Sequence, residues 1–150
     1  MGGMFERILV GIDAFPHSER VLAAAKDLAL KSRGSVLIAH VRDIPLPVTM
    51  AAAAGRPGLA GRMPGVEDEG AANDLVQGAV RSFQEAGVDV RGEVVSAWGA
   101  TARELLKLAD DFQADTIVVG HHGSQVAQIL LGSVAYRVVH QATCPVLVVR

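Results

Sequence analysis

Residues 115–150, DTIVVGHHGSQVAQILLGSVAYRVVHQATCPVLVVR, decide the fold class of this chain. The stretch begins with a β-branched apolar run that ends at Gly120, and a second such run starts at Pro145. Between the two runs, apolar residues recur with the 3.6-residue period of a helix over residues 133–141. A strand, a helix and a strand in this order predict a parallel βαβ unit.

The rest of the chain repeats this alternation. One apolar run, residues 90–97, alternates with polar residues and is predicted as an edge strand, whereas the others are nearly continuous and are typical of strands covered on both faces. Thr101 and Glu104 predict a capping box at the start of the third helix. The strands are expected at residues 7–12, 35–41, 90–97, 115–120 and 145–150, and the helices at residues 18–32, 73–86, 101–112 and 133–141.

These elements predict an α/β fold, a three-layer domain around a parallel five-stranded sheet. If the first three strands wind in one direction and the fourth and fifth in the other, the sheet is doubly wound with strand order 3-2-1-4-5. The 150 residues are expected to form a single domain, 1–150. Residues 43–72 interrupt the pattern with a stretch rich in Ala, Gly and Pro that is too long for an ordinary turn. Two interpretations remain for it: a mobile surface excursion, or a flap that covers the carboxyl edge of the sheet or contacts a partner.

Composition excludes several classes of protein. A net charge of −2 with no basic stripe gives no reason to expect a nucleic-acid partner. One cysteine, Cys144, excludes an internal disulfide and a multi-cysteine metal site. The N-terminus lacks a secretory signal, and no apolar run approaches the ~20 residues that span a bilayer. We therefore expect a cytoplasmic protein with no membrane insertion.

The predicted topology places a ligand site at the carboxyl ends of the first and fourth strands, where the winding direction reverses. Gly11 and Asp13 end the first strand, and a glycine loop with Gly120, Gly123 and Gly132 follows the fourth. Glycines let backbone N–H groups approach a phosphate, and Ser133 is expected to be the N-cap of the last helix. Asp13 is a good acceptor for a base amino group or ribose hydroxyls, so this pair of segments suits a nucleotide.

The local pattern alone fits an ordinary strand-to-helix turn as well. The loop lacks the lysine of a P-loop, and the first βα turn lacks G-x-G-x-x-G. A metal site at the His121–His122 pair is disfavoured because adjacent residues leaving a strand point in opposite directions. His122 is either close to a phosphate or a solvent-facing loop residue. His40 is interpreted as a hydrogen-bonded or edge-packed strand residue rather than a ligand, and Cys144 as a buried, inert thiol.

The chain resembles the universal stress protein family over nearly its whole length, except residues 43–72. The resemblance rests on RILVGID at residues 7–13, on WGATARELLKLADDFQADTIVVGHHG at residues 98–123 and, most specifically, on LLGSVAYRVVHQATCPVLVVR at residues 130–150. It implies the strand order given above and a homodimer formed through the last strand, Pro145–Arg150.

Family members that bind ATP carry G-x2-G-x9-G-[ST], an Asp after the first strand and a Val after the second. The resemblance therefore implies binding of ATP or AMP, with any Mg²⁺ carried by the nucleotide. In this chain eight residues rather than nine separate the last two glycines of the pattern, which shortens the loop by up to ~3.5 Å. The implied nucleotide-binding residues are Gly11, Asp13, Val41, Gly120, Gly123, Gly132, Ser133 and Val134.

Three functions follow from this interpretation. The first is a stress-response regulatory module that binds an adenine nucleotide and acts on a protein partner that the sequence does not identify. The second is a scaffold of the same fold that binds no nucleotide. The third is a slow ATPase. We expect no catalytic residue and no metal ligand, since the sequence offers no general base at a γ-phosphate position.

Overall fold

The computed structural model describes residues 3–13, 18–44, 54–55, 67–121 and 131–150. Strands and helices alternate through the described part of the chain, as the sequence predicts. The strands are β1 (Arg7–Ile12), β2 (Ser35–Asp43), β3 (Val90–Ala97), β4 (Thr116–Gly120) and β5 (Val146–Val149). The helices are α1 (Ser18–Ser32), α3 (Glu69–Glu85), α4 (Thr101–Phe112) and α5 (Ser133–Gln141).

The five strands form one parallel sheet in the order β3-β2-β1-β4-β5, which confirms the predicted topology. β1 is central, and it pairs with β2 through to Ile12–His40 and with β4 through to Val10–Val118. The chain winds outward to β3 in one direction and to β5 in the other. The carboxyl ends of β1 and β4 therefore lie side by side at the switch point.

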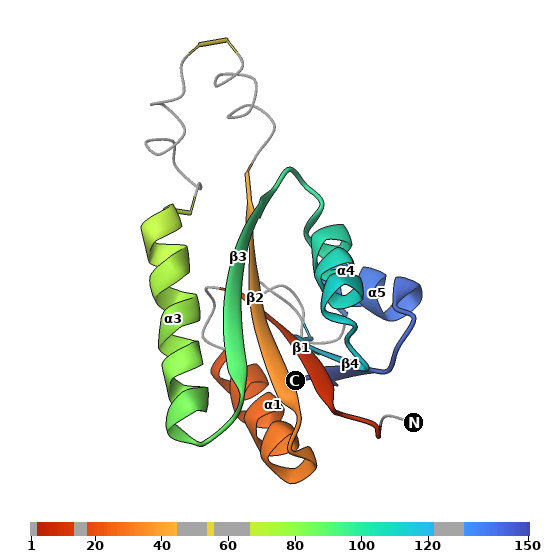
Figure 1. Ribbon diagram of the computed structural model, residues 1–150. Helices are drawn as coiled ribbons and strands as arrows, with labels where there is room; N and C mark the ends of the chain where they lie inside the picture. The colour runs from red at the N-terminus through yellow and green to blue at the C-terminus, as the bar shows by residue number, and fades with distance from the viewer. Residues whose placement is uncertain (1–2, 14–17, 45–53, 56–66, 122–130) are drawn as a thin grey trace.

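Helices cover both faces of the sheet. Figure 1 shows α1 and α3 on one face and α4 and α5 on the other. Alternate residues of the central strands enter two separate cores: Ile8 and Val10 pack with α1 and α3, whereas Leu9 packs with α4 and α5. This arrangement explains why the central strands read as continuous apolar runs.

β3 lies at one edge of the sheet, and its exposure alternates as the sequence predicts. Gly92 lies on its inner side, against α3. A Cβ atom at this position would lie 2.3 Å from Cγ1 of Val76 and 2.8 Å from Cγ2 of Val80. The glycine therefore permits an approach of helix to strand that no other residue allows.

α3 begins four residues earlier than its apolar period predicts, at Glu69 rather than Asn73. Asp68 caps the helix, because its side chain accepts a hydrogen bond from the N–H of Ala71 at 3.1 Å. Ala72 is completely buried, so the Ala- and Gly-rich start of the helix packs against the sheet. Residues 69–72 thus belong to a helix, and β2 extends to Asp43.

The predicted capping box at the start of α4 is wrong. The N-cap is Ala100, whose carbonyl accepts the N–H of Glu104 at 3.0 Å, and no side chain caps the helix. Gly99 has a φ of 66° and donates its N–H to Asp43 Oδ1 at 2.7 Å. This turn brings Ala100 into the cap position and makes Thr101 the first helical residue.

Candidate functional site

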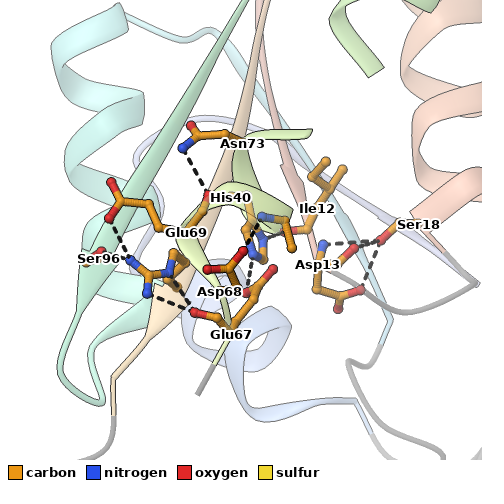
Figure 2. Close-up of polar contacts among 11 residues, drawn as sticks. Ile12, Asp13, Ser18, His40, Glu67, Asp68, Glu69, Asn73 and Ser96 are labelled. Carbon is orange, nitrogen blue, oxygen red and sulfur yellow. Dashed lines mark hydrogen bonds and ion pairs between the residues drawn. The ribbon is translucent and has the colours of Figure 1, made fainter. Parts of the chain in front are cut away.

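Asp13 follows directly after the central strand and is tied to the start of α1. The hydroxyl of Ser18 lies 2.7 Å from the Asp13 carbonyl oxygen and 2.9 Å from Asp13 Oδ1, and it accepts the Asp13 N–H at 3.1 Å. Ser18 is buried, whereas Asp13 is partly exposed. Figure 2 shows the two side chains turned toward each other. The carboxylate is therefore held in a defined orientation at the carboxyl edge of the sheet.

His121, the residue after β4, holds the two ends of the glycine loop together. Its N–H donates to the carbonyl of Val149 at 2.7 Å, and its carbonyl accepts the N–H of Gly132 at 2.7 Å. Gly132 is thereby fixed beside the end of β4, next to the strand that carries Asp13. Residues 122–130, and with them the predicted phosphate contact at Gly123 and the position of His122, lie outside the described residues.

Ser133 is not the N-cap that the sequence predicts. The N-cap of α5 is Gly132, and Ser133 is the first helical residue. The carbonyl of Gly132 begins the helical ladder by accepting the N–H of Tyr136 at 2.8 Å, and no side chain caps this end. The start of α5 consequently presents backbone groups and the positive end of the helix dipole, with no capping side chain over them.

The remaining predicted positions lie around this edge. Gly120 is the last residue of β4, and Val134 is in the first turn of α5. The Val41 side chain is buried in the core under α4 and α5. Gly11 faces the same core: a Cβ atom there would lie 3.2 Å from Leu105 Cδ1 and from Val119 Cγ1. Packing accounts for this glycine without a ligand.

A second polar cluster lies at the same edge, on the face covered by α1 and α3. His40 is buried, and its Nδ1 lies 2.8 Å from the carbonyl oxygen of Ile12 while its Nε2 lies 2.6 Å from Glu67 Oε2. The interpretation of His40 as a hydrogen-bonded strand residue is confirmed. Its partner was missed because Glu67 falls within the stretch interpreted as an excursion.

Arg42, two residues further along β2, completes this cluster. Its guanidinium donates to the Glu67 carbonyl through Nε at 3.1 Å and Nη2 at 2.8 Å, and Nη1 donates to Ser96 Oγ at 3.1 Å. Figure 2 shows Asp13 and His40 on either side of Ile12, so the two clusters meet at the end of β1.

Within the described ranges, no three His, Cys, Asp or Glu side chains gather in a way that could hold a metal ion. Likewise, no helix in this part of the chain is long and apolar enough to cross a bilayer. The polar groups described above at this edge are the Asp13 carboxylate, the start of α5, the His40–Glu67 pair and Arg42.

Comparison with known proteins identifies the family. A model of the universal stress protein family matches residues 4–150. The chain belongs to the universal stress protein family. Universal stress protein YxiE of Bacillus subtilis is 33% identical over 153 residues, covering 98% of this chain and all of the relative.

Solved structures of the family share this fold. UspA from Lactobacillus plantarum superposes with a TM-score of 0.80 at 19% identity, covering 99% of this chain and 100% of that chain. A universal stress protein in complex with cAMP superposes with a TM-score of 0.69 at 26% identity, covering 99% of this chain and 98% of that chain. The fold of this universal stress protein is therefore shared along its whole length.

Cys144 is half-buried beneath α4, where Leu106 and Asp110 line a small cavity with it. Burial raises the pKa of the Cys144 thiol above its usual value of 9.0, and the negative charges of Asp115 and Asp110 raise it further. A raised pKa leaves less thiolate at any given pH. We therefore expect Cys144 to react with Ellman's reagent more slowly than glutathione at pH 8, and faster after unfolding in guanidinium. A native rate equal to that of glutathione would contradict this.

Proposed function

We propose that this universal stress protein binds an adenine nucleotide, ATP or AMP, across the carboxyl ends of β1 and β4, and serves as a regulatory module of the stress response. The observation that carries the proposal is the convergence of Asp13 and the start of α5 at one sheet edge. Asp13 is oriented by Ser18, and Gly132 is fixed to His121 beside β4. Two segments far apart in sequence thus offer complementary chemistry at one place.

Each part has a defined role in this proposal. The Asp13 carboxylate accepts hydrogen bonds from the base amino group or the ribose hydroxyls. The backbone N–H groups of Ser133 and Val134 at the start of α5 bind the phosphates together with those of Gly120 and Gly123. Gly132 donates its N–H to the His121 carbonyl and thereby holds the start of the helix in place. Val41 contacts the base through its backbone. Mg²⁺ arrives with the nucleotide, since phosphate oxygens are its preferred ligands.

The family relative that was crystallised with cAMP supports the choice of an adenine nucleotide. A nucleotide held this way copurifies when it dissociates slowly. Denaturing the purified protein and passing the supernatant over an anion-exchange column tests the proposal. Adenine nucleotide is expected in the supernatant in proportion to the amount of protein. A supernatant without nucleotide, together with no measurable ATP binding, would refute the proposal.

We further propose that the protein forms a homodimer through β5. In β5 the carbonyls of Pro145 and Val149 accept hydrogen bonds from β4. Because backbone groups alternate in direction along a strand, those of Val146 and Val148 point to the open edge. An apolar edge strand of this kind pairs readily with another chain, and Leu147 is 43% exposed.

Replacing Val148 with proline removes an edge N–H group without removing a bond to β4. In size-exclusion chromatography with light-scattering detection, we expect Val148→Pro to have the mass of one chain and the wild-type protein to have the mass of two. Val148→Ala also removes the branched side chain, and removes more of it, but it retains the N–H, so it should remain a dimer. A dimeric Val148→Pro variant would place the interface elsewhere.

A further inference from the structure

Both ring nitrogens of His40 face oxygen atoms, one of Ile12 and one of Glu67. The carbonyl of Ile12 can only accept a hydrogen bond, so Nδ1 of His40 carries a hydrogen. The other ring nitrogen lies 2.6 Å from Glu67 Oε2, which is within hydrogen-bond distance. This contact needs a hydrogen on Nε2, which makes the ring an imidazolium, or on the carboxyl group. Without that hydrogen, a nitrogen lone pair would face a carboxylate.

The shared proton joins two parts of the fold. Glu67 immediately precedes Asp68, the N-cap of α3, whereas Ile12 immediately precedes Asp13 at the end of β1. The His40 ring is buried between them, so the contact is shielded from water, while the side chain of Glu67 is 26% exposed. A proton can therefore leave or reach the pair through Glu67 without opening the core.

The other charged groups near the pair fix what happens when the proton leaves. On α3, Asp68 caps the helix and Glu69 lies 3.6 Å from Arg42 Nη1; on β1, Asp13 is bound to Ser18. Opposite His40 on β3 is the uncharged Val94, and the buried residues of α1 carry no charge. Arg42 is the positive group beside Glu67, and it holds the Glu67 backbone at any pH at which proteins fold.

We propose that the His40–Glu67 pair is a proton-dependent link that fastens the beginning of α3 to the strand end carrying Asp13. When the pair loses its proton, the Glu67 side chain is repelled from the ring and the first turn of α3 loosens, while Arg42 still retains the Glu67 carbonyl. The beginning of α3 and the orientation of Asp13 then respond to pH. The effect on Asp13 rests on the proposed function, but the effect on α3 does not.

The test uses nucleotide-free protein and two variants of Glu67. NMR signals of the His40 ring nitrogens report their protonation, and amide exchange reports the protection of residues 71–75. In the wild type, protection is expected to fall about tenfold as His40 becomes singly protonated, which is a typical effect of losing one charge-assisted hydrogen bond. In Glu67→Gln, the amide N–H donates to a neutral ring, so protection should stay constant with pH. In Glu67→Ala it should be low throughout.

Glu69→Gln is the matched control, because it makes the same chemical change on the same helix end without touching His40, and it should behave as the wild type. Amide protection of residues 71–75 that does not change while the His40 ring signals change, or protection in Glu67→Ala equal to that in the wild type, would overturn the link.

An ATP titration over the same pH range is a separate measurement. If the ATP affinity of the wild type changes with pH in the same way as its amide protection, and the affinity of Glu67→Gln does not change with pH, the coupling to Asp13 is supported. A wild-type ATP affinity that does not change with pH refutes that coupling. Absence of ATP binding at every pH would instead refute the proposed function.

Discussion

Replacing Asp13 with alanine is expected to weaken ATP binding by roughly 10- to 100-fold, the usual effect of removing a charged hydrogen-bond partner from a ligand site. Asp13 lies at the switch point, and Ser18 orients its carboxylate at 2.9 Å. An oriented acceptor loses little entropy on binding, so its removal costs affinity directly. Isothermal titration calorimetry with nucleotide-free protein measures the change.

The matched control is Asp27→Ala. This change also removes one negative charge near α1. Asp27, however, is exposed within the helix, where its carboxylate forms an ion pair with Lys31. Its ATP affinity should equal that of the wild type. Asp13→Asn retains an oxygen acceptor and should lose less affinity than Asp13→Ala. Unchanged affinity in a folded Asp13→Ala variant would place the base and ribose elsewhere.

Replacing Gly92 with alanine is expected to lower the free energy of unfolding by about 2–3 kcal/mol, and the melting temperature by roughly 5–10 °C. The added Cβ atom would lie 2.3 Å from Val76 Cγ1, which no packed structure tolerates. Val76 is itself buried at 1% exposure, so it has no room to withdraw. α3 must then move away from the sheet. Thermal unfolding followed by circular dichroism measures the change.

Gly78→Ala provides the contrast on the same helix. Gly78 lies within α3, and the nearest atom to an added Cβ would be Arg81 Nη2 at 4.0 Å. Alanine there gains up to about 1 kcal/mol of helix propensity, so the variant should be more stable than the wild type. Equal stability of the Gly92→Ala variant and the wild type would mean that α3 does not pack on β3 as described.

Much of the fold is readable from the sequence because the two periodicities are strong. The continuous apolar runs of β1 and β4 and the alternating run of β3 correspond to central and edge strands. Strand–helix alternation indicated a parallel sheet, whereas the strand order 3-2-1-4-5 also required the family resemblance. Helix starts were less predictable. Thr101 and Ser133 both have capping side chains, yet in each helix the preceding residue is the N-cap, because tertiary hydrogen bonds at Gly99 and Gly132 fix the backbone first.

The candidate site was predictable only in part. Asp13 and Gly132 could be brought together because topology determines which strand ends are neighbours. The contact between His40 and Glu67 could not, since 27 residues separate them and a carboxylate in an Ala-, Gly- and Pro-rich stretch carries no periodic signal. The role of Gly92 was not predictable either, because the sequence does not show how closely a helix packs on the strand that contains the glycine.

One measurement tests the central claim most directly: titration of ATP with Mg²⁺ into nucleotide-free wild-type protein, followed by calorimetry. Saturable binding of one nucleotide per chain is expected, with AMP competing for the same site and with the signal greatly reduced in Asp13→Ala. A titration of folded protein that gives no binding heat up to millimolar ATP would contradict nucleotide binding and leave a scaffold of the same fold as the function of this chain.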